Sequence, residues 1–96
     1  MNNFIFSTIN AQGLNSQIKK NALISVSAQF RPDLICVQES NIDPIRHGAF
    51  NIRNYTSYFN PCTSSLGSGT ILFVKNIWSV RNMCILCEGK IQSVEI

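Results

Sequence analysis

The sequence predicts a mixed α/β (α+β) domain in which a β-α-β unit is followed by an antiparallel β-meander. The first part is predicted by two apolar runs, residues 4–10 and 34–37, on either side of a segment with helical periodicity. The second part is predicted from residue 55 onward, where short apolar runs alternate with turn residues. With 96 residues, 45% hydrophobic and 14% charged, the chain has the size and composition of one folded domain.

The β-α-β unit begins with a strand over residues 4–10, which are mostly β-branched or aromatic. A helix is predicted over residues 17–30, where Asn15 or Ser16 can cap the first turn. The helix ends before Pro32, because proline disfavours helical geometry in the residue that precedes it. One face of this helix has an apolar residue at every fourth position, with Leu23 between them: Ile18, Ala22, Val26 and Phe30.

A second strand is predicted over residues 34–37, whose continuous apolar run is typical of a strand buried on both faces. A strand, a helix and a strand in this order favour a right-handed crossover between two parallel strands. Residues 40–54 are polar and contain proline and glycine, so we expect a loop. Loops of this length are often functional or mobile.

The remaining strands are expected to be short and joined by tight turns. They are predicted at residues 55–60, 70–74, 77–80, 83–87 and 91–96, with residues 61–69 as a turn region. The sequence stops within the last strand pattern, which would leave an unpaired edge of a kind that natural domains usually avoid. We therefore expect residues 1–96 to form a partial domain that is truncated at its C-terminus.

Composition excludes several classes of protein. No apolar run approaches the roughly 18 residues that a membrane-spanning helix needs, and the first residues do not form a secretory signal. We expect an intracellular protein, nuclear or cytoplasmic, with no membrane partner and no disulfide among its four cysteines. Cys84 and Cys87 have C-x-x-C spacing, but no second ligand pair or redox context accompanies them. The net charge of +3 is compatible with phosphate-bearing partners without naming one.

Two polar residues mark the ends of the first two predicted strands. Asn10 ends the first strand and Glu39 follows the second. If these strands are parallel neighbours, both side chains emerge at one rim of the sheet, where ligands commonly gather in α/β folds. A carboxylate and a carboxamide oxygen suit a hard cation such as Mg²⁺. On spacing alone, a turn-forming asparagine and a solvated glutamate explain the same residues.

Three segments together resemble one known family: Ile9-Asn10-Ala11-Gln12-Gly13-Leu14, the run from Pro32 to Ser40, and the run from Gly69 to Lys75. They resemble the endonuclease/exonuclease/phosphatase superfamily, most of all the apurinic-like endonuclease domain of non-long-terminal-repeat retrotransposon polyproteins. The resemblance implies a two-sheet, four-layer α/β sandwich, of which this chain would be the N-terminal half.

The resemblance also implies roles for the residues at the rim. Glu39 would be the metal-binding carboxylate for Mg²⁺ or Mn²⁺, and Asn10 would help to hold the metal or the scissile phosphate. Gln38 would support the site from beside the ligand. Gln12 departs from the family pattern, which usually has Asp or Asn there, so any hydrogen bond that it makes is shifted by one methylene group.

The family hydrolyses a phosphodiester bond of DNA, with water as the nucleophile and an Asp–His pair that orients it. His47 is the only histidine and does not match that pair, so we expect it to be a surface residue. Arg46 and Arg53, in the loop after Glu39, are expected to lie close to the rim of the sheet and are candidates for contacts with the DNA backbone. We expect residues 1–96 alone to have no nuclease activity, because the other catalytic motifs of the family are not among them. In a whole polyprotein, such a domain would nick target DNA to prime reverse transcription.

Two alternatives remain open at this point. The chain could come from another branch of the superfamily, such as a phosphoinositide or sphingomyelin phosphodiesterase. It could also be a non-catalytic remnant, or a binding module that keeps the fold without the reaction.

Overall fold

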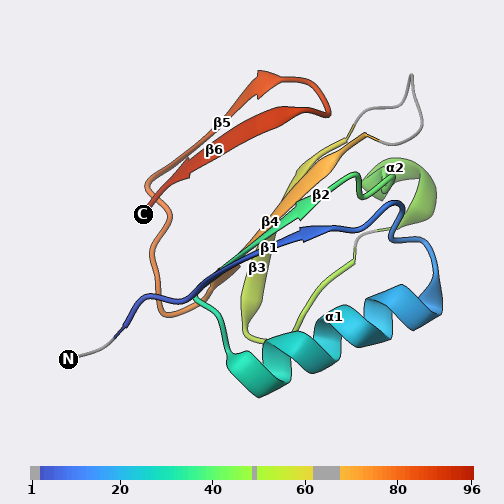
Figure 1. Cartoon of the computed structure of the whole chain (residues 1–96). Coiled ribbons are helices and arrows are strands. Elements are labelled where there is room, and N and C mark those ends of the chain that lie inside the picture. Colours follow the sequence, from blue (N-terminus) through green and yellow to red (C-terminus); the bar gives the residue numbers. More distant parts are fainter. Residues whose placement is uncertain (1–2, 49, 62–67) are drawn as a thin grey trace.

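The chain forms three layers, in which a helix and a hairpin cover opposite faces of a four-stranded sheet (Figure 1). The structure is a computed structural model that describes residues 3–48, 50–61 and 68–96, without the side chain of Arg46. In chain order the elements are β1 (Phe6–Asn10), α1 (Gln17–Phe30), β2 (Leu34–Gln38), α2 (Pro44–His47), β3 (Tyr55–Asn60), β4 (Thr70–Lys75), β5 (Asn82–Cys87) and β6 (Ile91–Glu95). The predicted mixed α/β class is confirmed.

The larger sheet has the strand order β1-β2-β4-β3. β1 and β2 are parallel, as the β-α-β pattern predicts, and β4 runs antiparallel to both β2 and β3. β3 pairs antiparallel with β4, and β5 with β6, as predicted for a meander, but β5 does not pair with β4, so the predicted meander is divided between two sheets. Since β4 already has a neighbour along each edge, the next strand cannot pair with it and the chain begins a new sheet.

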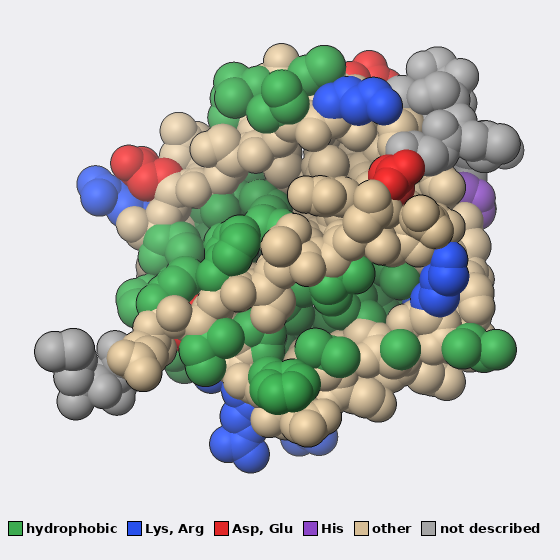
Figure 2. Space-filling view, viewed as in Figure 1, with side chains coloured by type: hydrophobic (Ala, Val, Ile, Leu, Met, Phe, Trp, Pro, Cys, Tyr) green, Lys and Arg blue, Asp and Glu red, His purple; other side chains and the backbone are tan. Residues whose placement is uncertain are grey.

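The core lies between α1 and the larger sheet. It is centred on side chains with no exposed surface: Ile35, Ile71 and Phe73. The prediction that β2 is buried on both faces is wrong for its second face, where Leu34 and Cys36 are half-buried. Among the described residues, the β5–β6 hairpin is the element that lies over that face, and Figure 2 shows apolar side chains in the recess beside it. Burial nevertheless raises the pKa of the Cys36 thiol.

Helix α1 has the predicted bounds because local signals set both of its ends. The Ser16 hydroxyl accepts a hydrogen bond from the Lys19 amide, and Arg31 takes the left-handed conformation at the C-terminal end. The predicted apolar stripe is buried only in part. Val26 is half-buried, and the buried residues of the helix are Leu23, which lies between members of the stripe, and Ser27. They lie four positions apart and face the sheet, whereas Ile18 at one end of the predicted stripe is 82% exposed.

Two predicted segments differ from the structure. Residues 40–54 contain the short helix α2, which begins because the Asp43 carboxylate accepts a hydrogen bond from the Ile45 amide (3.0 Å) and Pro44 occupies the first turn. Residues 77–80 form a turn and an irregular segment rather than a strand. Most of the predicted turn at 61–69 lies outside the described residues. No helix in the described ranges is long and apolar enough to cross a membrane.

Candidate functional site

The parallel pairing of β1 with β2 brings the two predicted metal ligands to one edge of the sheet. Asn10 lies opposite Gln38 in the register, and Glu39 is the next residue along the chain. Asn10 and Gln38 are exposed, and Glu39 is half-buried. We call this edge, made by Asn10, Gln12, Gln38 and Glu39, the rim. The predicted placement at a common edge is therefore observed, while the roles of these residues remain predictions.

Backbone hydrogen bonds continue past the strand ends and hold the two sides of the rim together. The Ala11 amide donates to the Gln38 carbonyl (2.9 Å), and the Gly13 amide donates to the Glu39 carbonyl (2.7 Å). The Leu14 amide extends this series with a 2.7 Å hydrogen bond to the carbonyl of Ser40. The segment after Asn10 and the segment around Glu39 are thus fastened to each other without using either side chain.

The Asn10 side chain takes part in the turn that follows β1. Its Oδ1 accepts a hydrogen bond from the Gln12 amide (3.2 Å), which is the turn-forming role that asparagine often has. Gln12 has a φ of 49°, in the left-handed region. A carboxamide oxygen has two lone pairs, so this contact leaves Asn10 able to bind a second group.

Lys19 contributes to the rim in a way that sequence reasoning missed. Its ammonium group donates hydrogen bonds to the carbonyl oxygens of Ala11 and Gln12, at 3.0 Å each. The lysine reaches these carbonyls because its helix begins directly after the turn. Lys19 therefore stabilises the turn and places a positive charge next to the rim.

Glu39 has a left-handed backbone conformation that residues other than glycine and asparagine rarely adopt. Its φ is 53°. Such strain costs about 1–3 kcal/mol and is concentrated at functional sites. The next residue, Ser40, has no exposed surface, and its amide donates to the Gly69 carbonyl (3.0 Å). The segment that carries Glu39 is therefore tied to β1 on one side and to the start of β4 on the other.

Asn60 and Asn41 are structural residues near this edge that sequence reasoning did not single out. Asn60 is fully buried at the end of β3, and its Nδ2 donates to the carbonyl oxygens of Cys87 (3.0 Å) and Ile91 (3.2 Å). Its Oδ1 accepts from the Gly89 amide (2.9 Å). Asn41 accepts a hydrogen bond from the Ser68 amide (3.0 Å). These contacts join segments far apart in the sequence, so no local pattern indicates them.

The predicted DNA contacts are not gathered at the rim. Arg53 lines a cavity of about 370 Å³ with Arg31 and Lys75, at the end of the sheet where β3 begins. The rim lies at the opposite end, so the expected placement of Arg53 beside it is wrong. The physical reason is that the chain runs the length of the sheet between residue 40 and β3. The Arg46 side chain lies outside the described part of the structure.

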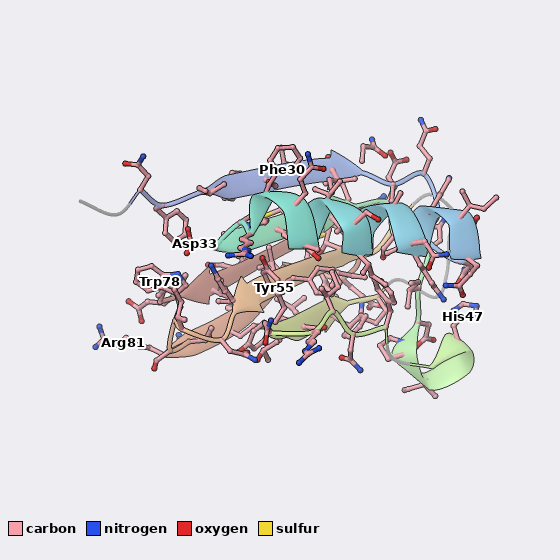
Figure 3. The ribbon with its side chains drawn as sticks, turned by 90° about the horizontal axis from the view of Figure 1, so that it is seen from below. Phe30, Asp33, His47, Tyr55, Trp78 and Arg81 are labelled. Carbon is pink, nitrogen blue, oxygen red and sulfur yellow. The ribbon has the colours of Figure 1, made fainter. Side chains whose placement is uncertain are left out.

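His47 is exposed at the end of α2, as predicted for a surface residue. Its Nδ1 accepts a hydrogen bond from the Asp43 amide (3.1 Å). Figure 3 shows it at the end of the molecule opposite Asp33 and Trp78.

The rim offers oxygen donors of the kind that Mg²⁺ and Mn²⁺ prefer. Within the described residues, no three His, Cys, Asp or Glu side chains lie together as a metal-binding group. Mg²⁺ is often held by one or two protein carboxylates, with waters and substrate phosphates as the other ligands. One carboxylate and one carboxamide at the rim therefore fit a magnesium ion better than a zinc ion, which prefers nitrogen and sulfur ligands.

The chain is similar to a number of solved structures, among them two AP endonucleases. One is the AP endonuclease LMAP from Leishmania major, with 30% sequence identity and a TM-score of 0.60 over 76% of this chain and 24% of that chain. The other is the catalytic domain of APE2 from Xenopus laevis, with 22% identity and a TM-score of 0.59 over 86% of this chain and 28% of that chain. The chain thus spans about a quarter of the length of these structures.

A scan of protein-family models and a search of curated proteins gave no match. The two solved structures are AP endonucleases, which are members of the endonuclease/exonuclease/phosphatase superfamily. The chain has the fold of the corresponding part of these enzymes, and the predicted resemblance to the superfamily is confirmed.

Proposed function

We propose that this chain, which has the AP endonuclease fold, supplies the metal-binding and phosphate-binding part of a DNA endonuclease that depends on a divalent metal ion. The observation that carries the proposal is the register of β1 and β2, which puts Asn10 and Glu39 at one edge of the sheet. The backbone around Glu39 supports it, because the hydrogen bonds from Gly13 to the Glu39 carbonyl and from Ser40 to Gly69 hold the segment that carries this carboxylate in place.

In this proposal Glu39 holds Mg²⁺ or Mn²⁺ through its carboxylate, and Asn10 uses its remaining hydrogen-bonding capacity for the metal or the scissile phosphate. Gln38, opposite Asn10, supports the site, and Gln12 acts through its backbone, which fixes the turn after β1. A bound divalent ion would neutralise negative charge on the phosphate as it is attacked by water. The chain's own contribution is to position the phosphate against these donors.

A calorimetric titration of the chain with MnCl₂ tests the metal site. We expect one binding event that is lost in Glu39→Gln, a variant that keeps the shape of the side chain and the backbone strain but removes the charge. Glu95→Gln is the matched control, because Glu95 is exposed on β6 and carries the same charge. If Glu39→Gln binds Mn²⁺ as tightly as the unmodified chain, the proposal fails.

We also propose, from the sequence resemblance, that the chain is the N-terminal fragment of a retrotransposon endonuclease domain. The run from Asn10 to Lys20 supports this branch, with Gly13-Leu14-Asn15-Ser16 leading into a lysine-bearing helix. The transcript sequence beyond Ile96 tests it. An Asp-x-Asn motif followed by an Asp-His motif in the same reading frame is expected, and a long open frame without either motif would contradict it.

A second candidate function is a non-catalytic binding module. Two observations favour it: Asn10 already bonds to the turn, and Gln12 replaces the residue that the family pattern usually has. A cooperative thermal transition without Mn²⁺ binding would support this module, and Mn²⁺ binding at Glu39 would exclude it.

A further inference from the structure

A cavity of about 610 Å³ lies at the end of the sheet opposite the rim, where the chain leaves β4. Three aromatic side chains line it and remain partly open to solvent: Phe4 is 48% exposed, Phe30 57% and Trp78 38%. Phe30 ends α1 and Trp78 lies in the segment after β4, and Figure 3 shows Asp33 between them in this view. The volume lies within the range of about 300–1,000 Å³ that is usual for sites that bind small organic groups.

The orientation of Trp78 is set by the carboxylate of Asp33. The indole Nε1 donates to Asp33 Oδ1 (2.9 Å), and the Ile5 amide donates to Asp33 Oδ2 (2.7 Å). The Phe4 ring packs against the indole with centroids 5.6 Å apart at an interplanar angle of 60°. The one polar group of the indole is thus occupied, and the ring offers only its apolar faces to a ligand.

Two cationic side chains line the same cavity. Arg31 is exposed at the C-terminal end of α1, and Lys75 ends β4, with its ammonium group 3.5 Å from the Arg31 carbonyl oxygen. Asp33 is the acidic residue of the cavity wall, and it is 6% exposed and bonded to two donors. The part of the cavity open to solvent therefore combines aromatic faces with positive charge.

We infer that this cavity binds a nucleotide of a single-stranded nucleic acid. An unpaired base would stack against Phe30 or Trp78, and the adjoining phosphate would lie against Arg31 and Lys75. Stacking on exposed aromatic rings next to cations is how proteins bind single strands without sequence preference. A duplex would not enter, because its bases are already stacked and paired. The inference is independent of the proposed metal site, which lies at the other end of the sheet.

Trp78 is the only tryptophan, so its fluorescence reports directly on this cavity. The test is a titration with an eight-nucleotide thymidine oligonucleotide, beside an abasic deoxyribose-phosphate chain of the same length. We expect saturable quenching by the oligonucleotide only. Phe30→Ala should weaken binding about tenfold, since stacking on one ring contributes roughly that much. Phe30 is exposed, so folding should persist, and a circular dichroism melt verifies it.

Arg31→Asn tests the phosphate contact. Asparagine tolerates the left-handed backbone of this position, where φ is 48°, so the variant removes charge without adding strain. We expect weaker binding and a salt dependence reduced by about 0.7 in logarithmic slope, the value for one phosphate contact on a single strand. Arg81→Gln is the matched control: it makes the same change in net charge at the same end of the molecule, outside the cavity (Figure 3).

Four results would overturn the inference. They are an absence of quenching, equal quenching by the abasic chain, equal effects of Arg31→Asn and Arg81→Gln, and thymidine monophosphate binding as tightly as the oligonucleotide. Repeating the titration in the presence of EDTA separates this inference from the proposed function, because stacking and the phosphate contacts in this cavity need no metal ion. Loss of quenching in EDTA would show that the strand binds through a metal ion and would also contradict the inference.

Discussion

Asp33 shows how one side chain can hold three segments of the chain together. Its two carboxylate oxygens accept hydrogen bonds from the Ile5 amide before β1 and from the Trp78 indole after β4. The hydrogen bond from the Ile5 amide, and after it the one from the Trp78 indole, hold the pKa of Asp33 below its ordinary value. Burial raises this pKa in part, and nearby Lys75 lowers it further. The ionised carboxylate is therefore the form that the fold stabilises.

This lowered pKa predicts a specific pH dependence of stability. Because the folded state favours ionised Asp33, its contribution is complete at neutral pH and is lost as the pH falls through 3.8 and then through the lower pKa of the folded state. Asp33→Asn should cost about 1.5–3 kcal/mol in the free energy of unfolding at pH 7, the usual range for hydrogen bonds to charged groups. Urea unfolding at pH 7 and pH 3 measures it. A deficit in Asp33→Asn that is as large at pH 3 as at pH 7 would contradict this assignment.

Position 69 has to be glycine because a side chain there would collide with Ser40, which follows Glu39 of the rim. The φ of Gly69 is 96°, and a Cβ atom there would lie 2.9 Å from the Ser40 hydroxyl oxygen. Gly48 serves as a control for backbone strain, because its φ of 80° is also positive but a Cβ atom there would meet nothing within 4 Å. Each substitution carries the strain of a positive φ, about 1–3 kcal/mol. Gly69→Ala should in addition lose about 1–3 kcal/mol to the close approach of Ser40, in thermal or urea unfolding. Equal losses would show that Ser40 moves aside without cost.

At the scale of elements, Asn60 is the main polar connection between the larger sheet and the β5–β6 hairpin. Its side chain forms hydrogen bonds with both strands and the turn of the hairpin. Asn60→Ala would remove three hydrogen bonds and leave the buried Gly89 amide without this partner, so we expect a loss of about 3 kcal/mol. In hydrogen exchange, the amides of β5 and β6 should lose protection before those of β1 and β2.

Asn76→Ala is the control for this prediction. Asn76 is exposed and its side chain bonds only to the exposed hydroxyl of Thr56 (2.7 Å) among the described contacts. Its removal should change stability by less than about 0.5 kcal/mol. If Asn60→Ala were equally mild, the hairpin would be held mainly by its other contacts with the sheet, such as the hydrogen bonds from Gln92 Nε2 to the Tyr58 carbonyl (3.2 Å) and from the Gly69 amide to the Gly89 carbonyl (2.8 Å).

Elements with local boundary signals could be predicted from the sequence, and elements shaped by distant contacts could not. Ser16 directly precedes α1 and Pro32 lies two residues after its end, so the sequence predicts α1 with its observed bounds. Residues 77–80 have the composition of a strand, but Trp78 bonds to Asp33, 45 positions earlier in the sequence. The start of α2 was a missed local signal, since Asp43-Pro44 is a recognisable helix beginning.

The candidate site was likewise predictable where it depends on local sequence signals and not where it depends on distant contacts. Asn10 and Glu39 could be placed together because each directly follows a predicted strand, and parallel neighbours end at one edge. The bonds of Lys19 to the turn, and the left-handed backbone of Glu39, depend on how the strands and the helix pack. Arg53 was misplaced because the path of residues 40–54 along the sheet is not encoded in their spacing.

At the scale of the whole molecule, the described residues supply one carboxylate to the rim and no Asp–His pair beside it. Phosphodiester hydrolysis needs a positioned water as well as a metal ion, and losing one member of a cooperating catalytic set removes most of the rate. We therefore predict that residues 1–96 alone do not nick supercoiled plasmid DNA in the presence of Mg²⁺. Nicking that is abolished by Glu39→Ala would contradict this prediction and would mean that the rim suffices for the reaction.

The central claim is that Asn10 and Glu39 share one divalent ion, and paramagnetic broadening of NMR signals by Mn²⁺ tests it most directly. With substoichiometric Mn²⁺, we predict that the side-chain amide signals of Asn10 and the backbone signal of Glu39 broaden first. This broadening should disappear in Glu39→Gln and persist in Glu95→Gln. Sharp Asn10 signals, with broadening centred on another carboxylate such as Asp43 or Glu88, would contradict the claim.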